Sequence, residues 1–194
     1  MNEQNEITED HTDTPEKNLA ETSHGTAAVP KLFKRFGREL AMQFLFQCDV
    51  AGMDDFAESL ENFWTQAELS GEFPDAKTYR KARAYAEKII AGVCEHEADI
   101  DQIISDASSH WEISRMPVVD RNIIRVAVFE LHYCPDIPAL VSINEAIEIA
   151  KDYSSDKSGI FINGLLNAVK DKLPPHSKIP AGKKAAGSLE EEEN

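Results

Sequence analysis

Residues 118–133 read VVDRNIIRVAVFELHY, and this stretch decides the fold. Its apolar side chains would lie on nearly every side of a helix, and several are β-branched, which also suits a strand. Strands rarely exceed about 10 residues, and this stretch is longer and contains neither Gly nor Pro. The pattern therefore predicts a buried central helix.

The segments on both sides of this stretch also carry apolar residues at helical spacing. Four helices are expected before it, at about 34–50, 54–67, 75–94 and 100–107, and two after it, at 142–152 and 157–173. Ser142 and Glu145 have the spacing of a capping box, so we place a helix start there. Gly164 is tolerable inside the last helix if another helix crosses closely. The sequence predicts an all-α body of about seven helices in two packed groups, with the first four helices in one group.

The two ends of the chain differ from this body. Residues 1–30 hold seven acids, one lysine and no aromatic residue, so they cannot bury enough surface to fold alone. We therefore predict a disordered acidic leader at 1–30, a helical domain at 31–173 and a disordered tail at 174–194. No apolar run approaches the ~20 residues of a membrane span, and the three cysteines have no paired spacing. These features predict a cytoplasmic protein with no membrane partner.

The start of the body, KLFKRFGRELAMQFLFQ at residues 31–47, carries an unusual charge pattern. Four cations precede its first acid, Glu39, in a chain of net charge −15. They lie at the amino end of a predicted helix, where the helix dipole disfavours positive charge. The cations also alternate with Phe33 and Phe36, and RNA-binding surfaces combine cations with stacking rings. A basic junction that only keeps the helix soluble is the alternative.

The turn SSDKSGIF at residues 154–161 has two interpretations. Ser, Asp and Gly are ordinary residues at a helix start, and Phe161 would then be core. Alternatively, the free N–H groups of that helix start, together with Lys157, would bind phosphate. Asp120, Arg121 and Arg125 most simply cap the central helix and form salt bridges, with Glu130 as a possible partner.

Catalytic and metal-binding patterns are missing from the sequence. The histidines of the body, His96, His110 and His132, have no second ligand at metal spacing, and there is no P-loop, GxGxxG or GxSxG. We therefore expect neither an enzyme nor a cofactor or metal site.

Three motifs resemble one known family. VVDRNIIRVAVFEL, followed by VSINEAIEIAKDYSSDKSGIFINGLL at 141–166, closely resembles the carboxyl half of the NusB transcription antitermination factors. KRFGRELAMQFLFQ, residues 34–47, is similar to that family's RRxARExAxQxLYxxQ start. The resemblance spans about residues 33–173, and over 50–110 it rests mainly on the helix pattern.

The resemblance implies a fold of two perpendicular three-helix bundles and a non-enzymatic factor that binds boxA elements of ribosomal RNA transcripts. It implies NusE, a ribosomal protein, as partner, within an elongation complex of RNA polymerase and other Nus factors. The implied RNA contacts fall on Lys34, Arg35, Arg38, Phe46, Lys157, Ser158 and Phe161, with Asp156 at the same helix start. Asp120 matches an acidic position on the implied NusE-contacting surface.

Some points depart from the family or stay open. Phe36 stands where the family often has a further cation, and it is either a stacking ring or a core residue. The acidic leader would repel RNA, so we hypothesise a screening or self-inhibiting arm. NusB-like domains also occur in ribosomal RNA cytosine methyltransferases, and a helical adaptor without an RNA role is a further alternative. A homodimer is possible, because some family members pair two copies.

Overall fold

The computed structural model describes residues 29–52, 55–108, 112–155 and 157–173, and in them every regular element is helical. The α-helices are α1 (Val29–Ala51), α2 (Phe56–Leu69), α3 (Ala76–Glu95), α4 (Glu97–Ala107), α5 (Val118–Tyr133), α6 (Ala139–Tyr153) and α7 (Ser158–Lys172). One 3₁₀ turn, η1 (Ile113–Arg115), precedes α5. The predicted all-α fold of about seven helices is confirmed.

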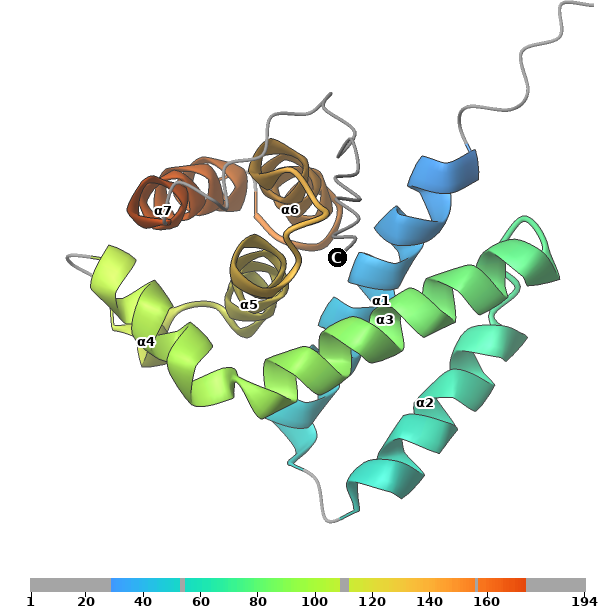
Figure 1. Cartoon of the computed structure of the whole chain (residues 1–194). Coiled ribbons are helices and arrows are strands. Elements are labelled where there is room, and N and C mark those ends of the chain that lie inside the picture. The colour runs from blue at the N-terminus through green and yellow to red at the C-terminus, as the bar shows by residue number, and fades with distance from the viewer. Residues whose placement is uncertain (1–28, 53–54, 109–111, 156, 174–194) are drawn as a thin grey trace, which may run out of the picture.

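The helices form two groups that cross at a steep angle. Helices α2 and α3 run across the view in Figure 1 with α1 beside them, whereas α5, α6 and α7 are seen nearly end-on. Helix α4 packs against α5 and α7, although it follows α3 in the chain. Our assignment of the fourth helix to the first group was therefore wrong, because the α3–α4 junction at His96 redirects the chain toward the second group.

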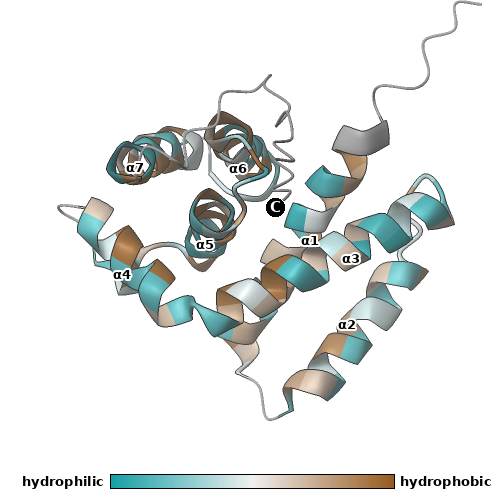
Figure 2. Cartoon of the chain, in the orientation of Figure 1, coloured by the Kyte–Doolittle hydropathy of each residue, from teal (hydrophilic) through white to brown (hydrophobic). Residues whose placement is uncertain are grey.

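Helix α5 is the centre of the fold, as its sequence predicts. It packs against α1, α3, α4, α6 and α7, and eleven of its sixteen residues are buried. The other helices are amphipathic, and Figure 2 shows hydrophobic and hydrophilic residues sharing each of them. Because α5 contacts both groups, its few polar residues meet partners from helices far apart in sequence.

Three helices begin earlier than the sequence suggested, among them α4, which starts at Glu97 and not at residue 100. Helix α1 starts at Val29 and not at residue 34, so Lys34, Arg35 and Arg38 lie beyond its first turn. Helix α6 starts at Ala139, after Pro138, and the predicted capping box at Ser142 is therefore wrong. Ser142 instead lies inside the helix, where its side chain is buried. Asp55 and Asp75 are the N-caps of α2 and α3, and each side chain accepts a hydrogen bond from the backbone N–H three residues later.

Close helix crossings occur at two glycines other than the expected one. A Cβ at Gly164 would meet no atom within 4 Å, so the expected close crossing there is wrong. A Cβ at Gly92 of α3 would lie 2.1 Å from the ring of Phe129 in α5, and one at Gly37 of α1 would lie 2.9 Å from the Ala82 carbonyl of α3. These two glycines let α3 approach its neighbours.

The predicted leader covers residues 1–30 and the predicted tail residues 174–194. Residues 1–28 and the tail lie outside the described residues, whereas residues 29 and 30 already belong to α1. Asp156 lies outside the described residues as well. No helix in the described ranges is long and apolar enough to cross a membrane.

Candidate nucleic-acid interface

The first predicted cation, Arg35, is surrounded by carboxylates. Its Nε lies 2.5 Å from Glu39 one turn along α1, and its Nη2 lies 2.7 Å from Asp152 near the end of α6. Glu145 of α6 adds a third carboxylate at 3.9 Å. Burial raises the pKa of Glu39, although the charge of Arg35 opposes that shift. Arg35 therefore joins α1 to α6, and an RNA phosphate would have to compete with these acids for it.

Arg38 is buried and belongs to a polar cluster in the core. Only 3% of it is exposed, and its Nε donates to Glu130 Oε1 of α5 at 2.8 Å. Tyr85 of α3 donates to the same oxygen, and Ser142 of α6 donates to the other carboxylate oxygen at 2.6 Å. Burial and the Glu130 charge raise the pKa of Tyr85. The cluster ties four helices together, and it directs Arg38 away from the surface.

Lys34 lies on a different side of α1 from Arg35. Its Nζ is 5.3 Å from the ring centroid of Tyr85 in α3, whereas the next residue, Arg35, reaches toward α6. Successive residues of a helix point about 100° apart, which explains the separation. Lys34 also lines a groove with Val141 and Asn144 of α6. Arg38, one turn later, lines the same groove and lies 5.7 Å from the same Tyr85 ring, so Lys34 and Arg38 share one side of α1 and Arg35 lies on another.

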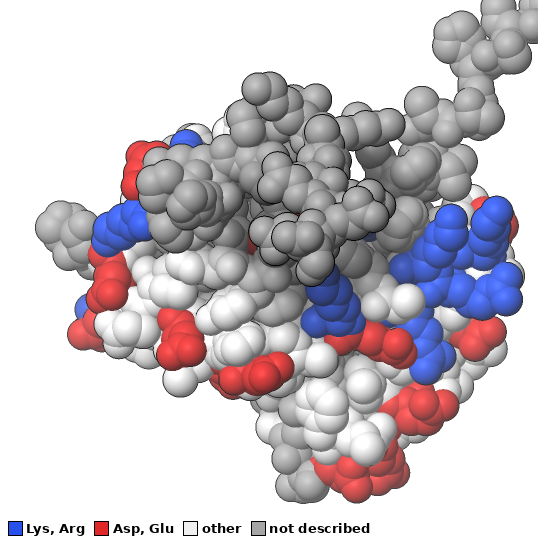
Figure 3. All heavy atoms as spheres, viewed as in Figure 1, with Lys and Arg blue, Asp and Glu red and all other residues white. Residues whose placement is uncertain are grey.

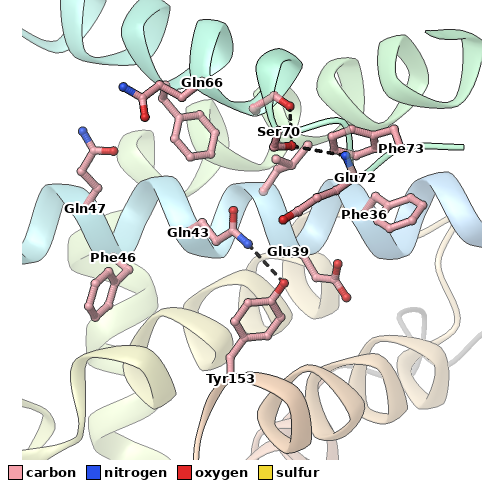
Figure 4. Close-up of a pocket in the computed structure, with 13 residues that line it drawn as sticks. Phe36, Glu39, Gln43, Phe46, Gln47, Gln66, Ser70, Glu72, Phe73 and Tyr153 are labelled. Atoms are coloured by element: carbon pink, nitrogen blue, oxygen red, sulfur yellow. Dashed lines mark hydrogen bonds between the residues drawn. The ribbon is translucent and has the colours of Figure 1, made fainter. Parts of the chain in front are cut away.

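Phe46 lines a groove of about 450 Å³ between α1 and α2, shown in Figure 4. Gln43, one turn earlier in α1, donates to the Tyr153 hydroxyl at 3.2 Å. The other lining residues are mainly aromatic or amide, among them Phe36, Gln47, Phe63, Gln66 and Phe73. Such a lining offers ring faces and hydrogen-bonding groups to an unpaired base. Phe36 was expected to be either a stacking ring or a core residue. It lines this groove, and it also packs against the core and edge-on against Phe73, with ring centroids 5.2 Å apart.

Gln43 and Tyr153 were not among the predicted site residues. Gln43 stands three positions before Phe46, a spacing that places both on one side of α1. The sequence therefore indicated that Gln43 lies beside the predicted site residue Phe46. Tyr153 is the last residue of α6 and is separated from Gln43 by 110 positions. No local pattern connects two residues so far apart.

The second predicted half of the site surrounds Asp120 at the start of α5. Ser158 donates to Asp120 Oδ2 at 2.9 Å, and Ser154 donates to Asp120 Oδ1. The carboxylate is buried and accepts both hydroxyls, which fixes the α6–α7 turn against α5. Lys157 is exposed beside this cluster, and Phe161 borders a groove of about 390 Å³ with it. The structure thus joins the predicted partner residue Asp120 to the predicted RNA residue Ser158.

The two grooves flank the same turn. Tyr153 closes the α6 side of the Phe46 groove, and Ser154, the next residue, binds Asp120 beside the second groove. Phe46 and Phe161 therefore belong to neighbouring surfaces that α6 and its turn separate.

An ion-pair cluster near these grooves fixes the end of α1. Asp49 accepts hydrogen bonds from Asn122 at 2.9 Å and from Arg121 at 3.0 Å, and Arg125 lies 3.2 Å away. Arg125 also binds Asp101 of α4 at 2.6 Å. Partial burial raises the pKa of Asp49, but the hydrogen bonds and cationic neighbours outweigh it and leave the pKa below its ordinary value. The predicted role of Arg121 and Arg125 in salt bridges is confirmed, whereas Glu130 pairs with Arg38.

This cluster predicts an acid-sensitive part of the stability. A lowered pKa in the folded state means that the contribution of Asp49 is complete above about pH 5 and is lost as the pH falls further. We expect Asp49→Asn to lower the free energy of unfolding at pH 7, and the gap to wild type to shrink between about pH 5 and 3. Urea unfolding at several pH values across this range measures the difference in unfolding free energy between the two proteins. Glu61→Gln, on the exposed side of α2, is the control. A gap that is the same at pH 7 and pH 3 would contradict the assignment.

The fold and these surfaces define a class, that of all-helical domains built from two crossed helix groups. In the described residues, no group of three or more His, Cys, Asp or Glu could hold a metal ion. Residues 36–171 match the model of the NusB family, and the chain belongs to this family.

Individual relatives support the family assignment. The chain is 44% identical over 144 residues to the transcription antitermination protein NusB of Geotalea uraniireducens, covering 73% of this chain and 96% of that protein. It is 44% identical over 141 residues to NusB of Desulfotalea psychrophila, covering 71% and 94%. A solved structure of T. maritima NusB is similar with a TM-score of 0.59 and 35% identity, covering 72% of this chain and 91% of that one.

A further similar structure contains ligands. It is a complex of the antitermination factors NusB and NusE with double-stranded RNA, at a TM-score of 0.60, covering 72% of this chain and 96% of that one. At 24% identity, this likeness concerns the fold alone.

Proposed function

We propose that this chain is an RNA-binding transcription antitermination factor. Its RNA would be the boxA-type elements of ribosomal RNA transcripts, and its partner the ribosomal protein NusE, within an elongation complex of RNA polymerase and other Nus factors. Membership of the NusB family, matched over residues 36–171, carries the proposal. The relatives named above are transcription antitermination proteins, and a structure of similar fold holds NusB with NusE and RNA.

In this proposal the protein acts by binding the RNA and holding it in place, without a chemical step. Phe46 supplies a ring in a groove whose amide groups can pair with a base, while Lys34 and Lys157 supply positive charge. Arg35 can contact an RNA phosphate only if that phosphate displaces the carboxylates paired with Arg35. We give Arg38 a positioning role, because its buried guanidinium holds α1 against Glu130 and cannot reach a ligand without leaving the core. Phe161 and Ser158 form the second surface, with Asp120 proposed at its NusE-facing side.

The test measures binding of boxA RNA to the full chain, with and without NusE, against a scrambled RNA of the same length. We expect preference for boxA and tighter binding when NusE is present. Phe46→Ala should weaken binding by roughly 5- to 150-fold, since stacking of one base contributes about 1–3 kcal/mol. Leu69→Ala, an exposed truncation on α2 away from the groove lining, serves as the control. Equal affinity for boxA and scrambled RNA under both conditions would refute the proposal.

A further inference from the structure

The cations that lack acidic partners lie mainly on α3. We call the exposed residues Lys77, Arg80, Lys81 and Lys88 of α3, together with Lys34 of α1, the basic stripe. None of the five forms an ion pair with another described residue, whereas Arg35 and Arg38 of α1 each contact at least two carboxylates. In a chain of net charge −15, the available positive charge is therefore concentrated on one face.

The α3 members of the stripe share one side of that helix, with three of them between positions 77 and 81 and Lys88 about two turns later. Positions 77, 81 and 88 follow one side of the helix, and Arg80 lies beside them. Eleven residues at 1.5 Å per residue give a length of about 16 Å. Figure 3 shows a cluster of blue side chains on the side of the molecule where α1 and α3 meet.

The stripe is held in place by aromatic rings from α1 and α3. The Lys81 ammonium lies 5.6 Å from the ring centroid of Phe33, and Lys34 lies over Tyr85. Phe33 and Tyr85 pack edge to face, with centroids 6.5 Å apart. Cation–π contacts restrain the two lysines without neutralising them, so their charges stay available to a ligand.

The position of Lys77 works against the stability of α3. Lys77, Arg80 and Lys81 lie in its first two turns, and its first turn contains no acid. The helix dipole disfavours positive charge in the first turn, so Lys77 lowers the stability of α3. Asp75 at the N-cap offsets only part of this. Exposed, unpaired cations at a helix end that disfavours them are a reason to infer a binding role for this surface.

We propose that the basic stripe binds the phosphate backbone of RNA. This inference rests on the proposed function and deepens it, because it assigns the phosphate contacts mainly to α3. A strand of stacked nucleotides rises about 3.4 Å per phosphate, so about 16 Å of stripe faces roughly five phosphates. Such contacts orient an RNA without reading its sequence, which is left to the rings and amides of the Phe46 groove.

The groove and the stripe are neighbours. The groove extends along α1 to Phe73, in the loop between α2 and α3, and Lys77 follows four residues later. Phe73 packs on both Phe36 of the groove and Tyr79 in the first turn of α3. An RNA strand that leaves the groove at this loop therefore meets the amino end of α3.

The test compares two triple variants with the same change in net charge. The stripe variant carries Lys77→Gln, Arg80→Gln and Lys81→Gln, and the control carries Lys151→Gln, Lys170→Gln and Lys172→Gln on α6 and α7. We measure the affinity of the full chain for boxA RNA and for scrambled RNA between 50 and 200 mM salt. Loss of three phosphate contacts should weaken binding of both RNAs at least tenfold at 50 mM salt and reduce the salt slope by about 2.

Each outcome has a distinct meaning. Stripe and control variants with equal affinity and slope would overturn the inference, even if wild type prefers boxA. Tighter RNA binding by the stripe variant would also overturn it, and would point to a competing acidic segment, such as residues 1–28, on the stripe. A wild-type chain that binds both RNAs equally, but loses both in the stripe variant, would support the stripe and refute boxA recognition. A wild-type chain that binds neither RNA would overturn both.

Discussion

The Glu130→Ala variant should lose about 3–5 kcal/mol of unfolding free energy at pH 7. Glu130 is 1% exposed, and Arg38, Tyr85 and Ser142 all donate to its carboxylate. Removing the carboxylate leaves the Arg38 guanidinium buried without its main counter-charge, and one of its nitrogens already has no hydrogen-bond partner. Two hydroxyls lose their acceptor at the same time.

Urea unfolding followed by circular dichroism measures this loss. Glu87→Ala is the control, because Glu87 pairs with Arg83 on the surface of α3, where such a pair contributes only about 0.3–0.5 kcal/mol. The double variant Arg38→Met, Glu130→Leu should be more stable than Glu130→Ala alone, since it removes both buried charges. If Glu130→Ala does not fold, Glu130→Gln keeps the size of the side chain and still removes the charge. A loss below about 1 kcal/mol for both single variants would show that the ion pair is not needed.

Local patterns predicted the helices because each apolar stripe repeats within its own segment. Residues 118–133 formed the expected buried helix, and the sequence also indicated that its arginines and Glu130 make ion pairs. The partners themselves came from elsewhere in the chain. Arg35 meets Asp152 across 117 positions, and Arg38 meets Glu130 across 92, so the sequence showed the cations but not the acids that surround them.

The basic stripe was visible in the sequence and was missed. The rule that drew attention to residues 31–47, cations at the amino end of a helix, also applies to Lys77 in the first turn of α3. What the sequence could not show is which of these cations stay unpaired, because the acids of α5 and α6 form their ion pairs with α1, as Glu130, Glu145 and Asp152 do. The Phe46 groove likewise needs α2 and the end of α6 to lie on either side of α1, and these two helices are distant in sequence.

Gly92→Ala should destabilise the protein by about 1–3 kcal/mol, as overpacking of a core does. A Cβ there would lie 2.1 Å from one carbon of the Phe129 ring and 2.2 Å from another. The ring cannot simply move away, because it is buried in α5 and stacks on Tyr133 with centroids 5.5 Å apart. Either α3 and α5 separate, or the ring leaves its position, and both loosen the junction between the two helix groups.

Gly164→Ala is the matched control because it makes the same chemical change inside another helix. A Cβ added at Gly164 would meet no atom within 4 Å outside its own stretch of helix, so the substitution gains helix propensity without a clash. It should stabilise the protein by roughly 0.5–1 kcal/mol. Thermal and urea unfolding of the two variants should therefore shift in opposite directions. If Gly92→Ala also stabilised, then α3 and α5 would not be in the close contact on which the crossing of the two groups depends.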